Sequence, residues 1–321
     1  MTGIIVKIIN SNLAHSSHLF GVSGSGKTRL SLDGLCQNWG LYISCRAKRG
    51  PGSGSDDFKV ATELLLSMST WHHDITSANI SQNRDAAHRV FAMLLCARFF
   101  ILEQFVRHLP VDTNITVARR RWMLAQVMPP RLMFEDDDLF VKLLRDLRFG
   151  DTKIMLLIIR STLRDLTTKR RDLFPLERGD TPLFVVIDEA QVAADDLQDF
   201  FRYGSGTDPR PILREMYNFF HTSGIFAGII LSGTGLSMKT VKDTVGSFSA
   251  KQVDQRMHPR VFTDIGRFTR DNSSQEVYIR RYLTLADDNI SDQRLLERMA
   301  YWFSGRYVHY LMLQDSFSSL I

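Results

Sequence analysis

The segment from Gly21 to Thr28 constrains the fold of this chain more than any other, because it fits the phosphate-binding pattern G-x-x-x-x-G-K-[ST]. A short apolar run ending at Phe20 precedes it, and Leu30, Leu32 and Leu35 follow at the spacing of a short helix. Strand, loop and helix are therefore all predicted here. The alternative is a Gly/Ser-rich turn that matches by chance. The motif consists of Gly21, Val22, Ser23, Gly24, Ser25, Gly26, Lys27 and Thr28.

Each residue type in this loop has a chemical reason. Glycines adopt positive φ and let the backbone approach a phosphate. Successive N–H groups form an anion-binding nest, and the following helix adds the positive end of its dipole. Lys27 is expected to reach the β- and γ-phosphates, and the Thr28 hydroxyl to ligate Mg²⁺. We therefore predict a nucleoside triphosphate site along the loop, extending to Arg29.

A second motif lies about 160 residues downstream. Leu183–Ile187 is a continuous apolar run, typical of a strand buried on both faces of a parallel sheet, and it ends in Asp188 and Glu189. This is the Walker B pattern. Asp188 is expected to hold Mg²⁺, often through water, and Glu189 to orient and polarise the attacking water. A strand ending in a solvated acidic turn is the alternative, but the upstream phosphate loop favours the catalytic interpretation.

A third element, the apolar run Phe226–Leu231, ends in small polar residues. In nucleotidases with an extra strand between the two Walker strands, a polar residue at this place senses the γ-phosphate. Ser232 and Thr234 are candidates, and a strand running into a glycine turn is the alternative. Glu189, Lys27, Ser232 and Thr234 are thus the predicted catalytic residues. Candidates for an arginine finger, each with a surface or ion-pairing role as the alternative, are Arg260, Arg267, Arg280, Arg281 and Arg306.

The pattern of elements predicts an α/β fold of the P-loop NTPase type. We expect a parallel sheet of about five strands flanked by helices, a long helical insertion and a truncated C-terminal helical lid. The insertion is a natural place for partner contacts, and the apolar stripe of the terminal residues favours self-association. The predicted parts are an N-terminal extension (1–16), the NTPase domain (17–270, insertion about 57–175) and a partial lid (271–321).

Composition places the chain among globular proteins, since hydrophobic residues make up 44% and charged residues 23% of it. The net charge of +5 favours an anionic ligand without establishing nucleic-acid binding. Cys36, Cys45 and Cys96 have no metal-site spacing, which favours a reducing compartment.

The run Val90–Val106 is too short and too charged to span a membrane, so a buried helix is expected. With no signal peptide recognised, the predicted location is the cytoplasm or nucleus.

Four polar clusters are interpreted as structural. Glu135–Asp138 is expected to be a solvated helix start, where acidic side chains suit the helix dipole. His72 and His73 have no spaced partner that would make a metal site. Arg119–Arg121 and Lys169–Arg171 are expected to be solvated helix faces, with nucleic-acid contact as the alternative.

From Phe20 to about Arg306 the chain resembles the P-loop ATPase domain of fungal Crinkler-type proteins, which are related to the signal-transduction ATPases with numerous domains (STAND) and to the AAA+ group. The resemblance covers most of the chain. The Walker elements are shared by many families, and the narrower match lies in the other segments. The resemblance rests on Gly21–Thr28, Leu35–Gly40, Val186–Gln191, Leu231–Gly235 and Phe262–Gly266.

The resemblance implies a switch or motor ATPase coupled to a separate effector module, often nuclease-like, behind a ubiquitin-like targeting header. Only about 20 residues precede the loop, and the chain stops soon after Arg306, where the lid helices of the family would continue. A header is therefore not expected, and neither host-cell targeting nor a coupled nuclease is supported. A short lid also predicts weak intrinsic hydrolysis.

The leading expectation is a Mg²⁺-dependent switch that binds and hydrolyses ATP, with Mg²⁺ held by Thr28 and Asp188. One alternative is a degenerate nucleotide-binding interaction module without significant turnover. The other is a nucleic-acid-stimulated helicase-like ATPase, disfavoured because only 86 residues follow Gly235, too few for a second motor lobe. ATP or GTP preference, the partner, the oligomeric state, the finger arginine and the biological output all stay open.

Overall fold

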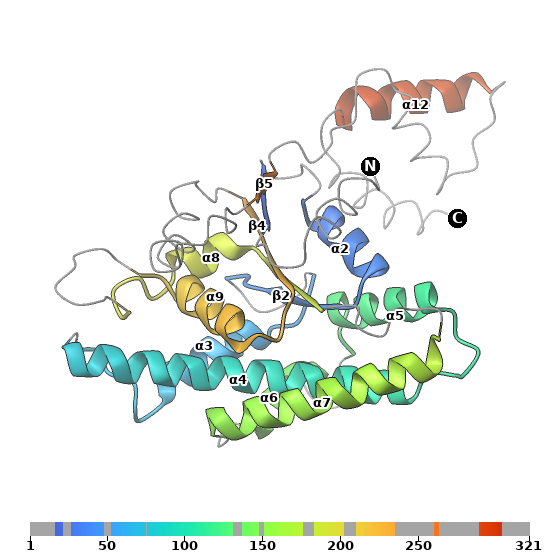
Figure 1. Cartoon of the computed structure of the whole chain (residues 1–321). Helices are drawn as coiled ribbons and strands as arrows, with labels where there is room; N and C mark the ends of the chain where they lie inside the picture. The colour runs from blue at the N-terminus through green and yellow to red at the C-terminus, as the bar shows by residue number, and fades with distance from the viewer. Residues whose placement is uncertain are drawn as a thin grey trace.

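The centre of the molecule is a parallel sheet of five strands in the order β2-β3-β4-β1-β5 (Figure 1). The predicted α/β class, a parallel sheet flanked by helices, is confirmed. The strand that leads into the predicted phosphate loop, β1, lies beside β4, and β3 lies on the other side of β4. An extra strand between the two predicted Walker strands is the arrangement that the polar end of the third apolar run led us to expect. The strands are β1 (Ser17–Gly21), β2 (Gly40–Ser44), β3 (Phe184–Asp188), β4 (Gly228–Thr234) and β5 (Arg260–Phe262).

The structure is a computed structural model that describes residues 17–21, 27–47, 53–74, 76–130, 137–147, 151–175, 183–201, 210–234, 260–262 and 289–303. The expected extension 1–16 lies outside these ranges, and so do residues 271–288 and 304–321 of the expected partial lid. Helices follow in chain order: α2 (Lys27–Gln37), α3 (Asp57–Ser67), α4 (Ser77–Arg107), α5 (Ile115–Val127), α6 (Leu139–Asp146), α7 (Thr152–Leu173), α8 (Ala190–Asp195), α9 (Ile212–Ser223) and α12 (Ile290–Phe303).

Helices cover both faces of the sheet (Figure 1). On one face, α2 and α5 pack over alternate strand residues such as Tyr42, Val186 and Ile230. On the other face, the intervening residues, among them Ile43 and Ile187, join a much larger core with the helices α3 to α9. The period-2 alternation therefore divides the apolar residues of β2, β3 and β4 between two cores.

The helical excursion predicted between the second and third strands is confirmed as α3 to α7. Its central member is α4, against which α7 packs (Figure 1). Residues 90–99 of α4 are all buried, so this stretch is covered on every side, and all of these residues but Arg98 are apolar. The expected buried helix at Val90–Val106 is thus confirmed. No helix of the described residues is long and apolar enough to cross a membrane.

Side chains of α4 and α5 close the open edge of the sheet at β2. The indole nitrogen of Trp122 donates to the carbonyl of Gly40 at 2.8 Å, and the Gln126 carboxamide accepts from the backbone N–H of Tyr42 at 2.9 Å. Arg98 donates to the carbonyl of Tyr42 at 2.6 Å. These three side chains, called here the edge clasp, satisfy backbone groups that an edge strand otherwise exposes.

Two structural interpretations of polar clusters are corrected. Asp138 does start α6, since its carboxylate accepts from the backbone N–H groups of Phe140 and Val141. It is buried rather than solvated, because it also accepts from the Ser55 hydroxyl at 2.9 Å. Arg170 is likewise buried, with its guanidinium 5.3 Å from the ring centroid of Trp39, so that arginine is not on a solvated face.

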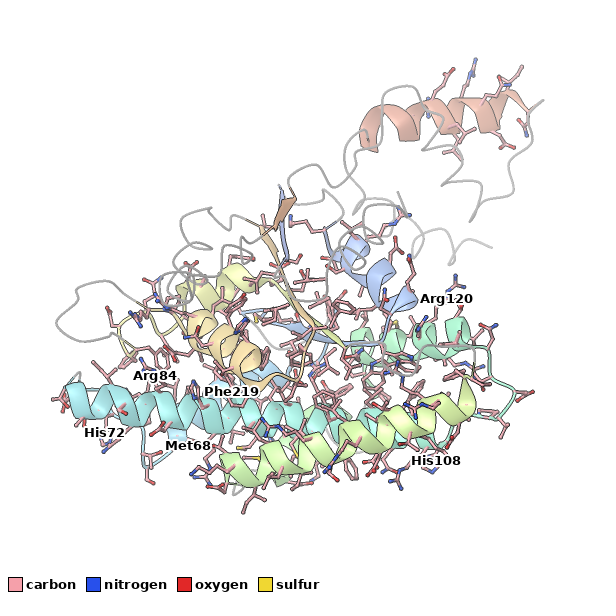
Figure 2. All side chains as sticks on the ribbon, viewed as in Figure 1. Met68, His72, Arg84, His108, Arg120 and Phe219 are labelled. Atoms are coloured by element: carbon pink, nitrogen blue, oxygen red, sulfur yellow. The ribbon has the colours of Figure 1, made fainter. Side chains whose placement is uncertain are left out.

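In the other basic cluster, Arg119–Arg121, a solvated helix face is expected. Arg120 fits this expectation, since it is exposed at the surface of α5 (Figure 2). The glycines and the proline of Arg46–Asp57, the segment before α3, predict a flexible loop there. Within its described part, Gly54 and Ser55 are buried, and the backbone N–H of Gly54 donates to Val127 at 2.7 Å. Arg46 adds an ion pair to Asp56 at 2.9 Å. This stretch is anchored, so the prediction of flexibility is wrong for it.

Candidate functional site

The predicted polar residues lie at one end of the sheet, where the parallel strands finish. Asp188 at the end of β3 is in register with Ser44 at the end of β2. Gly21 at the end of β1 is in register with Thr234 at the end of β4. In open α/β sheets this carboxyl edge is where ligands bind. The sheet therefore brings the carboxylate at the end of β3 and the polar end of β4 to the edge where the predicted phosphate loop begins, at Gly21.

The first turn of α2 meets the end of β3. The Thr28 hydroxyl donates to Oδ2 of Asp188 at 3.0 Å, a contact between residues 160 positions apart in the sequence. The Tyr42 hydroxyl donates to the same Oδ2 at 2.6 Å. Asp188 itself is buried. Its Oδ2 thus accepts one hydroxyl hydrogen bond from α2 and another from β2.

Lys27 is the first residue of α2, and it is buried at 6% exposure. Burial lowers the pKa of its ammonium group, and the negative charges of Asp188 and Glu189 raise it by a smaller amount. An anion bound beside Lys27 would add a further opposing charge and would therefore raise this pKa again. The position of Lys27 thus combines a partly desolvated positive charge with the N-terminal end of a helix.

Glu189 connects the end of β3 with the end of β4. Its carboxylate accepts a hydrogen bond from the side-chain amide of Gln191, and the carboxamide oxygen of Gln191 accepts from the backbone N–H of Thr234 at 3.0 Å. The backbone of Glu189 is in the left-handed region, with φ 53° and ψ 34°. This chain of contacts fixes the direction of the Glu189 side chain relative to β4.

Ser232 carries a buried hydroxyl. Its side chain has 0% exposure, and its Oγ has no hydrogen-bond partner among the described residues. An unpaired buried hydroxyl costs about 1–3 kcal/mol, so such groups call for an explanation. By the alternation of β4, Ser232 lies on the same face of the sheet as Ile230, the face that α2 covers.

The remaining predicted residues are placed in part. Arg29 pairs with Asp33 one turn further along α2, Nε to Oδ2 at 3.7 Å. Arg260 begins β5, which pairs with β1. Outside the described residues lie the inner loop residues Val22, Ser23, Gly24, Ser25 and Gly26 and the finger candidates Arg267, Arg280, Arg281 and Arg306.

Among the described residues, no group of three or more histidines, cysteines, aspartates and glutamates could hold a metal ion. The residues that do meet, Thr28 and Asp188, match the way proteins usually hold Mg²⁺, with few protein ligands and several oxygens from phosphates and water. Comparison with protein-family models, curated proteins and solved structures gave no match.

Sequence reasoning did not single out Tyr42, although its hydroxyl makes the shortest contact to Asp188. The residue is the third of β2, and Tyr42 and Val186 are opposite each other in the parallel register with β3. The tyrosine reaches Asp188 only through this register, which strand propensity does not specify. The sequence feature that could have pointed to this residue is the Tyr42 hydroxyl, a polar group between the apolar residues Leu41 and Ile43 of a predicted strand.

Proposed function

We propose that this chain binds a nucleoside triphosphate together with Mg²⁺, hydrolyses it and serves as a nucleotide-controlled switch. ATP is the nucleotide proposed. A P-loop NTPase fold of the Crinkler and STAND type is part of this proposal. The strand order supports it, because β4 separates the phosphate-loop strand β1 from the Walker B strand β3. The carboxyl ends of β1, β3 and β4 lie at one edge of the sheet, and the polar residues at the ends of β3 and β4 support it as well.

The hydrogen bond between Thr28 and Asp188 carries the proposal. The two residues come from motifs recognised independently and far apart in the sequence. A chance Gly/Ser turn gives no reason for its Thr28 hydroxyl to face the carboxylate at the end of a central strand. When bound, Mg²⁺ would neutralise charge on the phosphates. Thr28 and Asp188 are the residues that would hold it.

The protein residues have separable roles in this proposal. Lys27 binds the terminal phosphates with its ammonium group, as a point charge. Glu189, held by Gln191, orients a water and accepts its proton. The unpartnered hydroxyl of Ser232 is available to a phosphate oxygen or to a water next to it.

One observation favours a second candidate, a nucleotide-binding module with little turnover. The Glu189 carboxylate is engaged by Gln191 instead of being open toward the proposed nucleotide. A catalytic base must lie within hydrogen-bond reach of the water it activates, so this contact has to loosen before hydrolysis. The two candidates share the binding site and differ only in turnover.

The test is binding and hydrolysis of ATP and GTP by the purified chain and by Lys27→Ala. Removal of the ammonium should weaken triphosphate binding by tenfold or more, since hydrogen bonds to charged groups contribute about 1.5–3 kcal/mol. Lys153→Ala, an exposed lysine on α7, is the matched control and should bind as wild type does. Equal ATP affinity of wild type and Lys27→Ala would contradict the site. Binding without phosphate release would select the module.

A further inference from the structure

Tyr42 stands out because its hydroxyl is the closer of the two donors to Asp188. Both hydrogen bonds that Asp188 accepts from the described residues end on Oδ2. The carboxylate is thus held at Oδ2 by a strand residue and by a residue of α2. The second oxygen, Oδ1, accepts none from the described residues.

The ring of Tyr42 has little freedom to move. A Cβ added at Gly54 would lie 3.0 Å from Cε1 of Tyr42, so the backbone of Gly54 passes close to one edge of the ring. Gly54 has a φ of 96°, a value that other residues rarely adopt, which lets the chain make this close approach. The ring is therefore held between the sheet and this anchored stretch.

The backbone of Tyr42 is fixed as well, because the edge clasp holds it at both polar groups. Gln126 accepts its N–H, and Arg98 donates to its carbonyl. The hydroxyl consequently reaches Asp188 from a residue that is constrained at main chain and ring. This is the arrangement expected of a group that orients a ligand, since precise sites need support from rigid neighbours.

We propose that Tyr42 is a positioning residue for the metal carboxylate: its hydroxyl holds Oδ2 of Asp188 so that Oδ1 is presented to Mg²⁺ or to a metal-bound water. This inference rests on the proposed function and adds a residue to it. Tyr42 does not touch the metal or the nucleotide in this proposal. Its contribution should therefore appear in the dependence on Mg²⁺ and not in the affinity for the nucleotide alone.

The test compares Tyr42→Phe with wild type by titrating a fluorescent ATP analogue, in EDTA and at a series of Mg²⁺ concentrations. Phenylalanine keeps the ring and removes only the hydroxyl. We expect the Mg²⁺ midpoint for analogue binding to rise about tenfold, the effect of losing one hydrogen bond to a charged group. The affinity in EDTA should stay within about twofold of wild type, because the phosphate loop is unchanged.

The matched control is Tyr217→Phe, which removes the hydroxyl of another buried tyrosine, on α9. It should shift neither quantity. An unchanged Mg²⁺ midpoint in Tyr42→Phe, or an equal loss of affinity with and without Mg²⁺, would overturn the positioning role. Wild type that fails to bind the analogue at any Mg²⁺ concentration would overturn the proposed function itself. Thermal unfolding of each variant verifies that the proteins compared are folded.

Discussion

Glu189 is the residue with the most unusual backbone at the site. A glutamate with φ 53° and ψ 34° costs roughly 1 kcal/mol relative to a glycine in the same conformation. The left-handed turn stops β3 abruptly and begins α8 at the next residue. The Glu189 side chain is thereby directed to Gln191 and the end of β4 instead of continuing along the strand.

Replacement of Glu189 by glutamine separates binding from turnover. The amide keeps the size of the carboxylate and can accept a hydrogen bond from Gln191, but it cannot take a proton from water. Nucleotide and Mg²⁺ affinity should change by less than about threefold, while turnover should fall by about 10²–10⁴, the usual contribution of a general base. Steady-state phosphate release and equilibrium binding give the two readouts.

The control for that substitution is Glu63→Gln, an exposed glutamate on α3. It removes one negative charge without touching the carboxyl edge of the sheet, so turnover should be unchanged. Undiminished hydrolysis by Glu189→Gln would assign the base to another residue. Loss of nucleotide binding in this variant would instead show that the carboxylate charge supports Lys27.

At the residue scale, sequence patterns locate groups whose spacing is local. The phosphate-loop pattern predicts Lys27 and Thr28 at the start of a helix, and the apolar run Leu183–Ile187 predicts Asp188 at the end of a strand. All three residues lie at these places. Whether two such groups touch depends on register and helix placement, which are properties of the folded chain. The contact of Tyr42 with Asp188 is of that second kind, since 146 positions separate the two residues.

Among the elements, α4 is unusual because it buries a charged residue in a mostly apolar stretch. Arg98 has 0% exposure in the middle of a buried helix. Its guanidinium donates to both carboxylate oxygens of Asp57, Nε to Oδ2 at 2.6 Å and Nη2 to Oδ1 at 2.8 Å. It also lies 4.9 Å from the ring centroid of Phe140 and donates to the carbonyl of Tyr42. The ion pair therefore connects α3, α4 and the edge strand β2.

Replacing Arg98 by methionine should destabilise the fold by about 3–5 kcal/mol, because Asp57 would stay buried without its partner. Chemical denaturation measures the loss. In the same helix, Arg107→Met removes an ion pair to Glu103 in which the arginine side chain is 53% exposed, and it should cost less than about 1 kcal/mol. The double variant Arg98→Met with Asp57→Asn should recover part of the loss. Equal effects of the two arginine substitutions would contradict this role.

In the sequence, Arg98 interrupts the apolar run Val90–Val106, and this charge is one reason to expect a buried helix instead of a membrane span. The helix is indeed buried, but periodicity could not supply the partner, because Asp57 is 41 positions away. Helices and strands of this chain follow from local spacing. The contacts between α4, α5 and β2 come from tertiary packing, which local spacing does not encode.

On the scale of the whole molecule, the helices α3 to α7 are part of the main core. One continuous apolar cluster contains residues of α4, such as Phe91 and Leu95, together with strand residues such as Val185 and Leu231. Helix α4 also contacts α9 through the ion pair of Arg84 with Glu215, Nε to Oε2 at 3.1 Å, and through His88, whose ring centroid lies 5.3 Å from that of Phe219. A segment that shares its core with the sheet is not expected to fold or unfold alone.

Native-state hydrogen exchange tests whether the helices α3 to α7 unfold together with the sheet. Amides at the centre of α4, at Phe91–Leu95, and amides of β3, at Val185–Ile187, should open with the same free energy, equal to that of global unfolding. In α12, none of residues 290–298 is buried, so its amides should exchange through smaller local openings and provide an internal control. Saturating ATP and Mg²⁺ should raise the opening free energy of α4 and β3 equally, by about 2.7 kcal/mol at 100 times the dissociation constant. If ATP protected β3 and left α4 unchanged, the helical segment would be a separate cooperative unit, and the shared core would not make α4 and the sheet unfold together.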